Sequence, residues 1–221
     1  MKPGDRQGAL KPSLIAISVA ACFAVSAPDA SANPTGPTVA SGSAYFATAG
    51  SALNVTNSAN AIINWQGFSI GINEITRFLQ SSAGSAVLNR VIGAGGAIPQ
   101  SVIDGALQSN GRVFLLNPAG IVVGSGAHID VAGLVMSTLN LSDQDFLNGR
   151  LRFTEVPGAS GIKNQGSIET TSGGRVYLIA PDVQNTGIIH APQGDIILAA
   201  GKSAELVSEG SPLVSVKVTA D

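Results

Sequence analysis

The sequence predicts an all-β fold, and within that class a solenoid in which each repeat forms one coil. A strand phrase that begins Gly-Arg-Val at Gly111 returns at Gly174, and a Gly-Asp-Ile variant follows at Gly194. Repetition at multiples of about 20 residues is typical of a stacked repeat architecture. Charged residues make up only 12% of the chain, which also contains 27 glycines. That balance suits a core of small aliphatic side chains with glycine at the corners.

Composition excludes two other classes of protein. The 221 residues are enough for one domain with a substantial core. Hydrophobic residues make up 44% of the chain, which argues against disorder, because disordered chains are charged and poor in Val and Ile. The net charge is -2, whereas binding to nucleic acid requires a clustered basic surface. No nucleic-acid partner is therefore predicted.

Residues 1–32 are predicted to form a signal peptide. Basic residues near the start precede an apolar stretch at residues 14–25, which is too short to span a bilayer. Ala30 and Ala32 supply the small residues of a cleavage site, so the mature chain is expected to begin at Asn33. The single cysteine, Cys22, lies inside this segment. Lipidation of Cys22 is the alternative, because the residues before it loosely match a lipoprotein signal.

The mature chain, residues 33–221, is predicted to contain a cap at roughly 33–110 and regular coils at roughly 111–221. The clearest early strand lies at residues 62–71, where Ile62, Phe68 and Ile70 share one parity. Trp65, the single tryptophan, is expected in the core or the cap. A cap is needed because an open solenoid end exposes strand edges.

From residue 111 onward the repeat is regular. A corner that begins at Asn164 returns at Asn185, with glycine two residues later in both copies. Both residue types tolerate left-handed backbone, and stacked asparagine side chains can hydrogen-bond to each other. Strands that follow one sense around a coil pair in parallel, so Val176 should stack on Ile196. Residues 141–153 interrupt this pattern as an excursion. At about 20 residues per coil, the mature chain has room for about nine coils.

Side chains able to carry catalysis are scattered along the chain. His128 and His190 lie nearly three predicted coils apart, and the mature chain lacks the cysteines or spaced carboxylates of a metal site, so none is predicted. A calcium site needs a loop of oxygen ligands, and no such loop surrounds Asp143 and Asp145. Because no set of acids and bases converges, we expect no enzyme activity and no cofactor.

Four phrases occur in order after the predicted signal peptide. They are residues 64–71, with Asn64, Trp65 and Phe68; residues 87–93, with Asn89 and Arg90; residues 110–121; and residues 133–138. Together they resemble the N-terminal secretion domain of filamentous-haemagglutinin-like and high-molecular-weight adhesins, which are the exported proteins of two-partner secretion. The resemblance covers nearly the whole mature chain.

The resemblance implies a right-handed parallel β-helix with an N-terminal β cap. It also implies that the periplasmic modules of an outer-membrane β-barrel transporter recognise the chain, which then crosses the pore and folds outside. There it would be secreted or associated with the cell surface and would nucleate the β-helix of an adhesin. A host-cell receptor or glycan is a possible further partner of such a protein.

Asn117, Pro118 and Gly120 occupy the place of the family's Asn-Pro-Asn-Gly turn, with Ala119 at its third position. Proline presets the backbone at the first central position of a β-turn, and Asn117 can hydrogen-bond its own backbone two residues on. Two roles stay open for this turn. It is either a corner that only shapes the coil or a direct contact with the transporter.

The alternative function is a secreted β-helix that binds or cleaves carbohydrate. Such a protein needs acids or aromatic rings that line a groove. Aromatic residues make up only 5% of the chain, which counts against sugar stacking.

Overall fold

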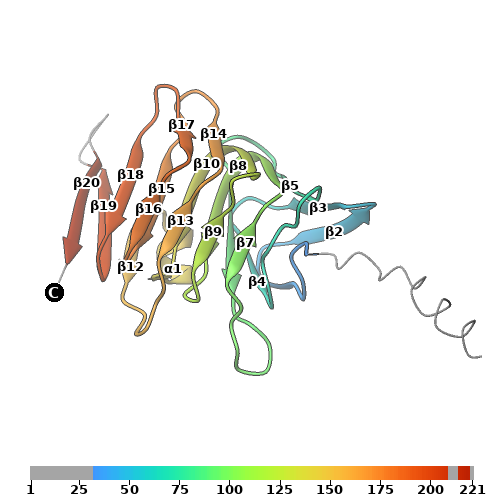
Figure 1. Cartoon of the computed structure of the whole chain (residues 1–221), viewed down its shortest axis with the longest axis horizontal. Coiled ribbons are helices and arrows are strands. Elements are labelled where there is room, and N and C mark those ends of the chain that lie inside the picture. The colour runs from blue at the N-terminus through green and yellow to red at the C-terminus, as the bar shows by residue number, and fades with distance from the viewer. Residues whose placement is uncertain (1–31, 209–213, 220–221) are drawn as a thin grey trace, which may run out of the picture. The chain divides into compact units, whose positions relative to one another are not determined.

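The computed structural model describes residues 32–208 and 214–219 (Figure 1). These residues belong to one compact unit, Ser31–Asp221. The predicted signal peptide lies outside the described residues except for Ala32. Parallel strands stacked rung upon rung make up most of the unit, so the predicted all-β parallel solenoid is confirmed.

Three columns of strands form the coils, and neighbours within each column pair in parallel. The first column contains β3 (Ala52–Asn57), β5 (Ile75–Leu79), the first halves of β8 (Ala106–Leu116) and β10 (His128–Ser137), β14 (Ser167–Thr170) and β17 (Ile188–His190). The second contains β4 (Ala61–Trp65), β6 (Ala86–Val91), the second halves of β8 and β10, β15 (Val176–Ala180) and β18 (Ile196–Ala200). The third contains β7 (Ser101–Ile103), β9 (Ile121–Val123), β13 (Ile162–Asn164) and β16 (Val183–Asn185).

Antiparallel strands flank the coils at two places. At the N-terminal end, β1 (Thr38–Ser41) pairs with β4, and β2 (Ala44–Ala49) pairs with β3. A separate outer sheet joins β11 (Asn140–Leu141), β12 (Leu151–Thr154), β19 (Ser203–Ser208) and β20 (Val214–Thr219). The short helix α1 (Asp143–Leu147) lies between β11 and β12. The predicted excursion at residues 141–153 is therefore confirmed.

The solenoid has about six coils, so the predicted number of nine is wrong. Paired positions along the first column are Ala52, Ile75, Ala106, His128, Ser167 and Ile188. The spacing between successive positions therefore varies from 21 to 39 residues. Loops and the excursion lengthen some coils, and the regular spacing seen near the C-terminus does not extend to them.

The boundaries of cap and coils also differ from the prediction. Parallel pairing already begins where Ala52 lies opposite Ile75, well before Gly111, so only β1 and β2 form an antiparallel cap. The coils end with β18, because β19 and β20 leave the solenoid for the outer sheet. The early coils were missed because their strands share no repeated phrase with the later ones.

Alternating side chains of the second column fill two separate cores. Inward residues such as Val113, Leu134 and Val176 lie inside the coils with Trp65 and Phe68. The outward residues between them form an outer core under the outer sheet and α1. This outer core includes Ile62, Leu88, Phe114, Val135, Phe146, Phe153, Tyr177 and Leu206. From β4 to β15 the second column is therefore largely buried on both faces, as continuous apolar strands require, whereas β18 is partly exposed.

The asparagine corner forms as predicted, but its glycine is needed for a different reason. Asn164 Nδ2 donates to Asn185 Oδ1 at 2.7 Å, so the predicted asparagine stack is confirmed. The predicted left-handed backbone is wrong, because neither Gly166 nor Gly187 has a positive φ. A Cβ on Gly166 would lie 2.5 Å from the carbonyl oxygen of Gly124. Glycine is required here because successive coils approach too closely for a side chain.

Candidate functional site

The predicted turn is present and its asparagine is fully buried. Gly120 N donates to Asn117 O at 3.0 Å, which closes a β-turn around Pro118 and Ala119. Asn117 Oδ1 accepts from Ala119 N at 3.0 Å, so the predicted bond to the backbone two residues on is confirmed. Gly120 has a φ of 108°, a conformation that favours glycine. Pro118 and Ala119 are half-buried and form the outer part of the turn.

Hydrogen bonds hold this turn between the coil before it and the chain after it. Asn117 Nδ2 donates to Pro99 O and to Ser101 Oγ, both at 2.9 Å. On the other side, Ser160 N donates to Pro118 O at 2.9 Å. The side-chain amide of Asn117 therefore uses both its donor and its acceptor within the chain. What the turn presents to a partner is the outer surface of Pro118 and Ala119.

Trp65 and Asn89 form a polar contact inside the solenoid. Trp65 Nε1 donates to Asn89 Oδ1 at 2.9 Å, and Asn89 Nδ2 donates to Phe114 O at 3.2 Å. Both side chains are fully buried. The contact joins three successive rungs. The amide of Asn89 on β6 accepts from the indole on β4 and donates to a backbone carbonyl on β8.

Aromatic rings surround this contact near the cap. The Trp65 ring meets Phe46 at 5.6 Å and Phe68 at 5.7 Å between centroids, both edge to face. Phe68 in turn stacks on Phe78 at 6.4 Å. Trp65 is therefore a core residue of the first coils, which confirms its predicted place in the core or cap.

Arg90 and Asn64 lie on adjacent strands but have different surroundings. Arg90 Nη1 pairs with Asp143 Oδ1 at 2.7 Å, and its Nη2 donates to Leu141 O at 2.8 Å. Arg90 therefore attaches the excursion to β6. Asn64 pairs with Arg90 in the ladder, and its Oδ1 is buried without a hydrogen-bond partner among the described residues.

The structure brings the predicted motif residues onto neighbouring rungs. Arg90 lies opposite Leu116, which directly precedes Asn117. The predicted cleavage residue Ala32 lies away from them, and its backbone N donates to both carboxylate oxygens of Glu74 at 3.0 Å. Ala30 lies outside the described residues.

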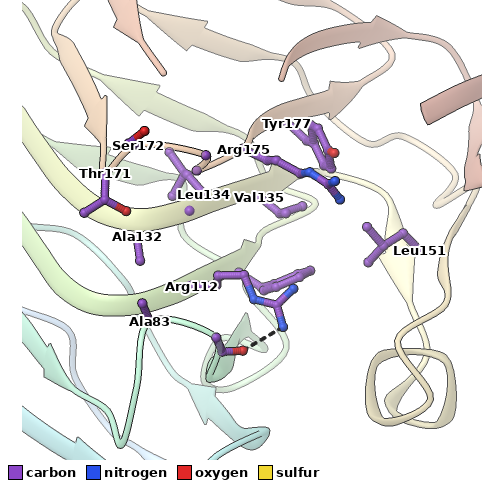
Figure 2. Close-up of a pocket in the computed structure, with 15 residues that line it drawn as sticks. Ala83, Arg112, Ala132, Leu134, Val135, Leu151, Thr171, Ser172, Arg175 and Tyr177 are labelled. Carbon is purple, nitrogen blue, oxygen red and sulfur yellow. Dashed lines mark hydrogen bonds between the residues drawn. The ribbon is translucent and has the colours of Figure 1, made fainter. Parts of the chain in front are cut away.

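A groove on the outer face of the second column was not predicted from the sequence. Its volume is about 490 Å³, and Arg112, Gly133, Arg175 and Tyr177 line it together with Leu151. Figure 2 shows both arginine side chains directed toward the side on which Leu151 lies. The signal for it was the repeated phrase itself, which places arginine and an aromatic residue at matching positions in two coils.

Tyr177 is the buried titratable group of this groove, with 3% of its surface exposed. Burial raises the pKa of its hydroxyl above the ordinary value of 10.0, and the positive charge of Arg175 offsets part of that rise. The hydroxyl makes no hydrogen bond to any group within the described residues.

Two further features are absent from residues 32–208 and 214–219. No three His, Cys, Asp or Glu side chains come together there as metal ligands. Over the same ranges, no helix has the length and apolar content needed to cross a membrane.

These features define a secretion domain built as a capped β-helix. The family model of the TPS secretion domain matches residues 24–218, and the chain therefore belongs to this family of two-partner secretion proteins. The crystal structure of the HMW1 secretion domain from Haemophilus influenzae is similar, with a TM-score of 0.78 and 34% sequence identity. The match covers 85% of this chain and 50% of that one. The resemblance inferred from the four phrases is confirmed.

The curated relatives are much longer proteins than this chain. The Heme/hemopexin-binding protein of Haemophilus influenzae strain Rd is 30% identical, over 76% of this chain and 23% of its own length. A second Heme/hemopexin-binding protein of Haemophilus influenzae is 40% identical over 84 residues, which are 38% of this chain and 9% of that protein. The chain thus spans under a quarter of the length of the relatives it matches.

Proposed function

We propose that this chain is recognised in the periplasm by an outer-membrane β-barrel transporter and nucleates the folding of a surface or secreted adhesin. The family match over residues 24–218 supports the first half of this proposal. The chain would cross the inner membrane by its signal peptide and then leave through the transporter pore. As a secretion domain it would act by binding and folding, without catalysis.

The last rung of the coils, formed by β17 and β18, supports the proposal that the chain nucleates folding. Ile196 and Leu198, which continue the inward column of Val176 and Leu178, are 46% and 45% exposed. In the described part of the chain, β17 and β18 pair with the preceding coil only. An apolar rung with free backbone groups on one side is a template on which a further coil of an exoprotein can pair.

We infer that Asn117 shapes the coil and does not itself touch the transporter. Its side chain is buried and bonded to Pro99, Ser101 and Ala119. Removal of a buried amide leaves its partners unsatisfied. Loss of secretion on mutation of Asn117 would follow from a weakened fold.

Binding to the transporter tests the proposal directly. The purified chain is titrated by calorimetry into the periplasmic modules of a two-partner secretion transporter encoded in the same genome. We expect saturable binding with one chain per transporter. Asn117→Ala should lower the melting temperature. The variant molecules that remain folded should bind the transporter with the affinity of the wild type. A folded wild-type chain that binds no such transporter from its own genome would overturn the proposal.

Ala119→Arg is the matched variant for the turn. It adds bulk and charge to the half-buried outer surface and leaves the donor and acceptor bonds of Asn117 in place. If the turn is only a corner, this variant keeps both its melting temperature and its affinity. Lost affinity in a folded Ala119→Arg protein would instead make the turn a transporter contact.

The aromatic side chains give the carbohydrate-binding alternative little support. Trp65, Phe68 and Phe78 are buried in the core of the solenoid and cannot stack on a sugar, and Tyr45 is the one exposed aromatic ring among the described residues. Adhesion to a host-cell receptor or glycan would therefore belong to other parts of an exoprotein. The full-length relatives, which are much longer, have room for such parts.

A further inference from the structure

The repeated strand phrase places two arginines in one outward column with a glycine between them. Arg112 pairs with Gly133 in the ladder, and Leu134 N donates to Arg175 O, which puts Arg175 on the following rung beside Gly133. Adjacent strands are about 4.8 Å apart, so the two arginine backbones lie about 10 Å apart. Gly133, which has no side chain, lies between them, and the stem of Arg112 leans over it.

Small residues keep this opening free. A Cβ on Gly133 would lie 3.2 Å from Arg112 Cγ and 3.5 Å from Arg175 O, so any larger residue would fill the space between the arginines. Ala83, Gly84, Ala132 and Gly174 form other parts of the lining. Backbone and small side chains therefore form the floor of the groove between Arg112 and Arg175.

Apolar side chains line the same groove next to the arginines. Phe114, Val135 and Tyr177 occupy the next outward column, and Leu151 lies on the side of the outer sheet. Figure 2 shows Leu151 across the hollow from the two arginines. A neighbouring hollow of about 290 Å³ is lined in part by Arg112, Phe114 and Tyr177 as well, so the groove continues toward α1.

The groove has more positive than negative charge. Arg175 Nε pairs with Asp195 Oδ2 at 3.1 Å. Arg112 donates from Nη2 to the carbonyl oxygen of Gly84 at 3.0 Å, and no carboxylate within the described residues pairs with it. The buried hydroxyl of Tyr177 adds a polar group without a hydrogen-bond partner among those residues. A guanidinium beside apolar surface is suited to an organic anion.

We propose that this groove binds a small carboxylic acid with a compact apolar body. The carboxylate would take paired hydrogen bonds from Arg112, and the field of Arg175 would add to the attraction. The apolar body would lie against Phe114, Val135 and Leu151. A volume of about 490 Å³ falls in the range of small-ligand sites. This site is independent of the transporter, so either proposal can fail alone.

Two tyrosines make the site directly observable. The chain contains only Tyr45 and Tyr177, and Tyr45 is 70% exposed. The full chain labelled with 3-fluorotyrosine therefore gives two fluorine resonances, which Tyr177→Phe assigns. We expect 4-phenylbutyrate to shift the Tyr177 resonance in a saturable manner and to leave the Tyr45 resonance in place. The neutral amide of the same compound should produce no shift at equal concentration.

Substitutions inside and outside the groove test the mechanism. Arg112→Gln keeps one amide donor of the pair and should weaken binding of 4-phenylbutyrate about tenfold, the effect of losing the other, charged hydrogen bond. Gly133→Ala, which narrows the groove, should also weaken binding. Arg150→Gln removes an exposed arginine that is not among the lining residues and should leave affinity unchanged. Circular dichroism confirms that each variant is folded.

Three results would overturn the proposal. These are equal shifts with the acid and its amide, a folded Arg112→Gln protein with unchanged affinity, and no saturable shift of the Tyr177 resonance. A peptide with one glutamate between two leucines is the remaining probe. If it binds and the free acid does not, the groove is a protein-binding surface, and the small-ligand assignment is wrong.

Discussion

Trp65 and Asn89 show how one buried polar pair can fix the register of three strands. The indole N–H and the amide of Asn89 satisfy each other and Phe114 O in a site without exposed surface. A shift of one residue in β6 would replace Asn89 with an apolar or charged neighbour and leave the indole donor unpaired. The pair therefore selects one stacking of the early coils.

Asn89→Ala should lower the free energy of unfolding by about 2–4 kcal/mol, because it leaves a buried donor and a buried acceptor unsatisfied. Urea denaturation followed by Trp65 fluorescence measures this change. Gln144→Ala, at an exposed position of α1, is the control and should stay within about 0.5 kcal/mol of the wild type. A variant at position 89 as stable as that control would contradict the assigned role.

Tyr177 predicts a loss of stability at high pH. Its folded-state pKa is raised above 10.0 by burial, so above pH 10.0 an unfolded tyrosine releases its proton while the folded one retains it. The folded state then binds more protons than the unfolded state, and stability falls as pH rises through that range. Thermal melts of the wild type and Tyr177→Phe from neutral to alkaline pH compare the two. The gap between them should change only above pH 10; parallel curves throughout would refute the expected linkage.

At the residue scale, the sequence predicts some side-chain contacts correctly and misses others. The own-backbone bond of Asn117 follows from local chemistry, and the stack of Asn164 on Asn185 follows from a corner that repeats after 21 residues. The need for glycine at 166 does not, because the clash arises with Gly124 on another coil. Contacts between coils depend on insertions whose lengths vary, and spacing alone cannot place them.

Arg90 is the link between the coils and the excursion, which is the least regular element of the fold. Its guanidinium bonds to both Asp143 and Leu141 O, while α1 contributes Phe146 to the outer core. The excursion is thus attached at one end by charge and at its middle by burial. Pairing of β12 with β19 and burial of Phe153 hold its far end, so loss of the arginine should loosen the excursion without detaching it.

Arg90→Gln should destabilise the excursion locally by about 1–2 kcal/mol, a value reduced by the partial exposure of Asp143. Hydrogen exchange measured by mass spectrometry should show faster exchange in β11, α1 and β12, with unchanged exchange in β8 and β10. Arg150→Gln breaks an exposed pair with Asp145 and is the control. Uniformly faster exchange across all coils would mean that Arg90 supports the whole fold instead.

At the element scale, repeated phrases predicted the late coils well and the early coils poorly. The register Val176 to Ile196 and Leu178 to Leu198 matches the columns expected from their spacing. The early strands β3 to β6 form equally regular parallel pairs without a shared phrase. The outer groove was not predicted, because it depends on the outer sheet, whose strands β12 and β19 lie far apart in sequence and cover part of that face.

For the whole molecule, the unpaired last rung predicts self-association of the purified chain. Leu198 continues the core column above Leu178, yet 45% of its surface is exposed. Leu198→Lys should reduce association seen by light scattering at rising concentration and lower the melting temperature only slightly. Leu178→Lys, one coil deeper in the same column, should prevent folding. A wild-type chain that stays monomeric at every concentration would contradict this expectation.

The outer sheet has a consequence for the order in which the protein can fold. Its partners lie far apart along the chain, because β12 ends at Thr154 and β19 begins at Ser203. A polypeptide that emerges from a pore N-terminus first can stack each coil at once on the preceding coil. Closure of the outer layer must wait until residue 219 is free, because β20 (Val214–Thr219) pairs with β19. A pause before that point would leave an intermediate in which the coils are stacked but the outer sheet is not formed. Phe114 and Val135 would then still be exposed to solvent on their outer side.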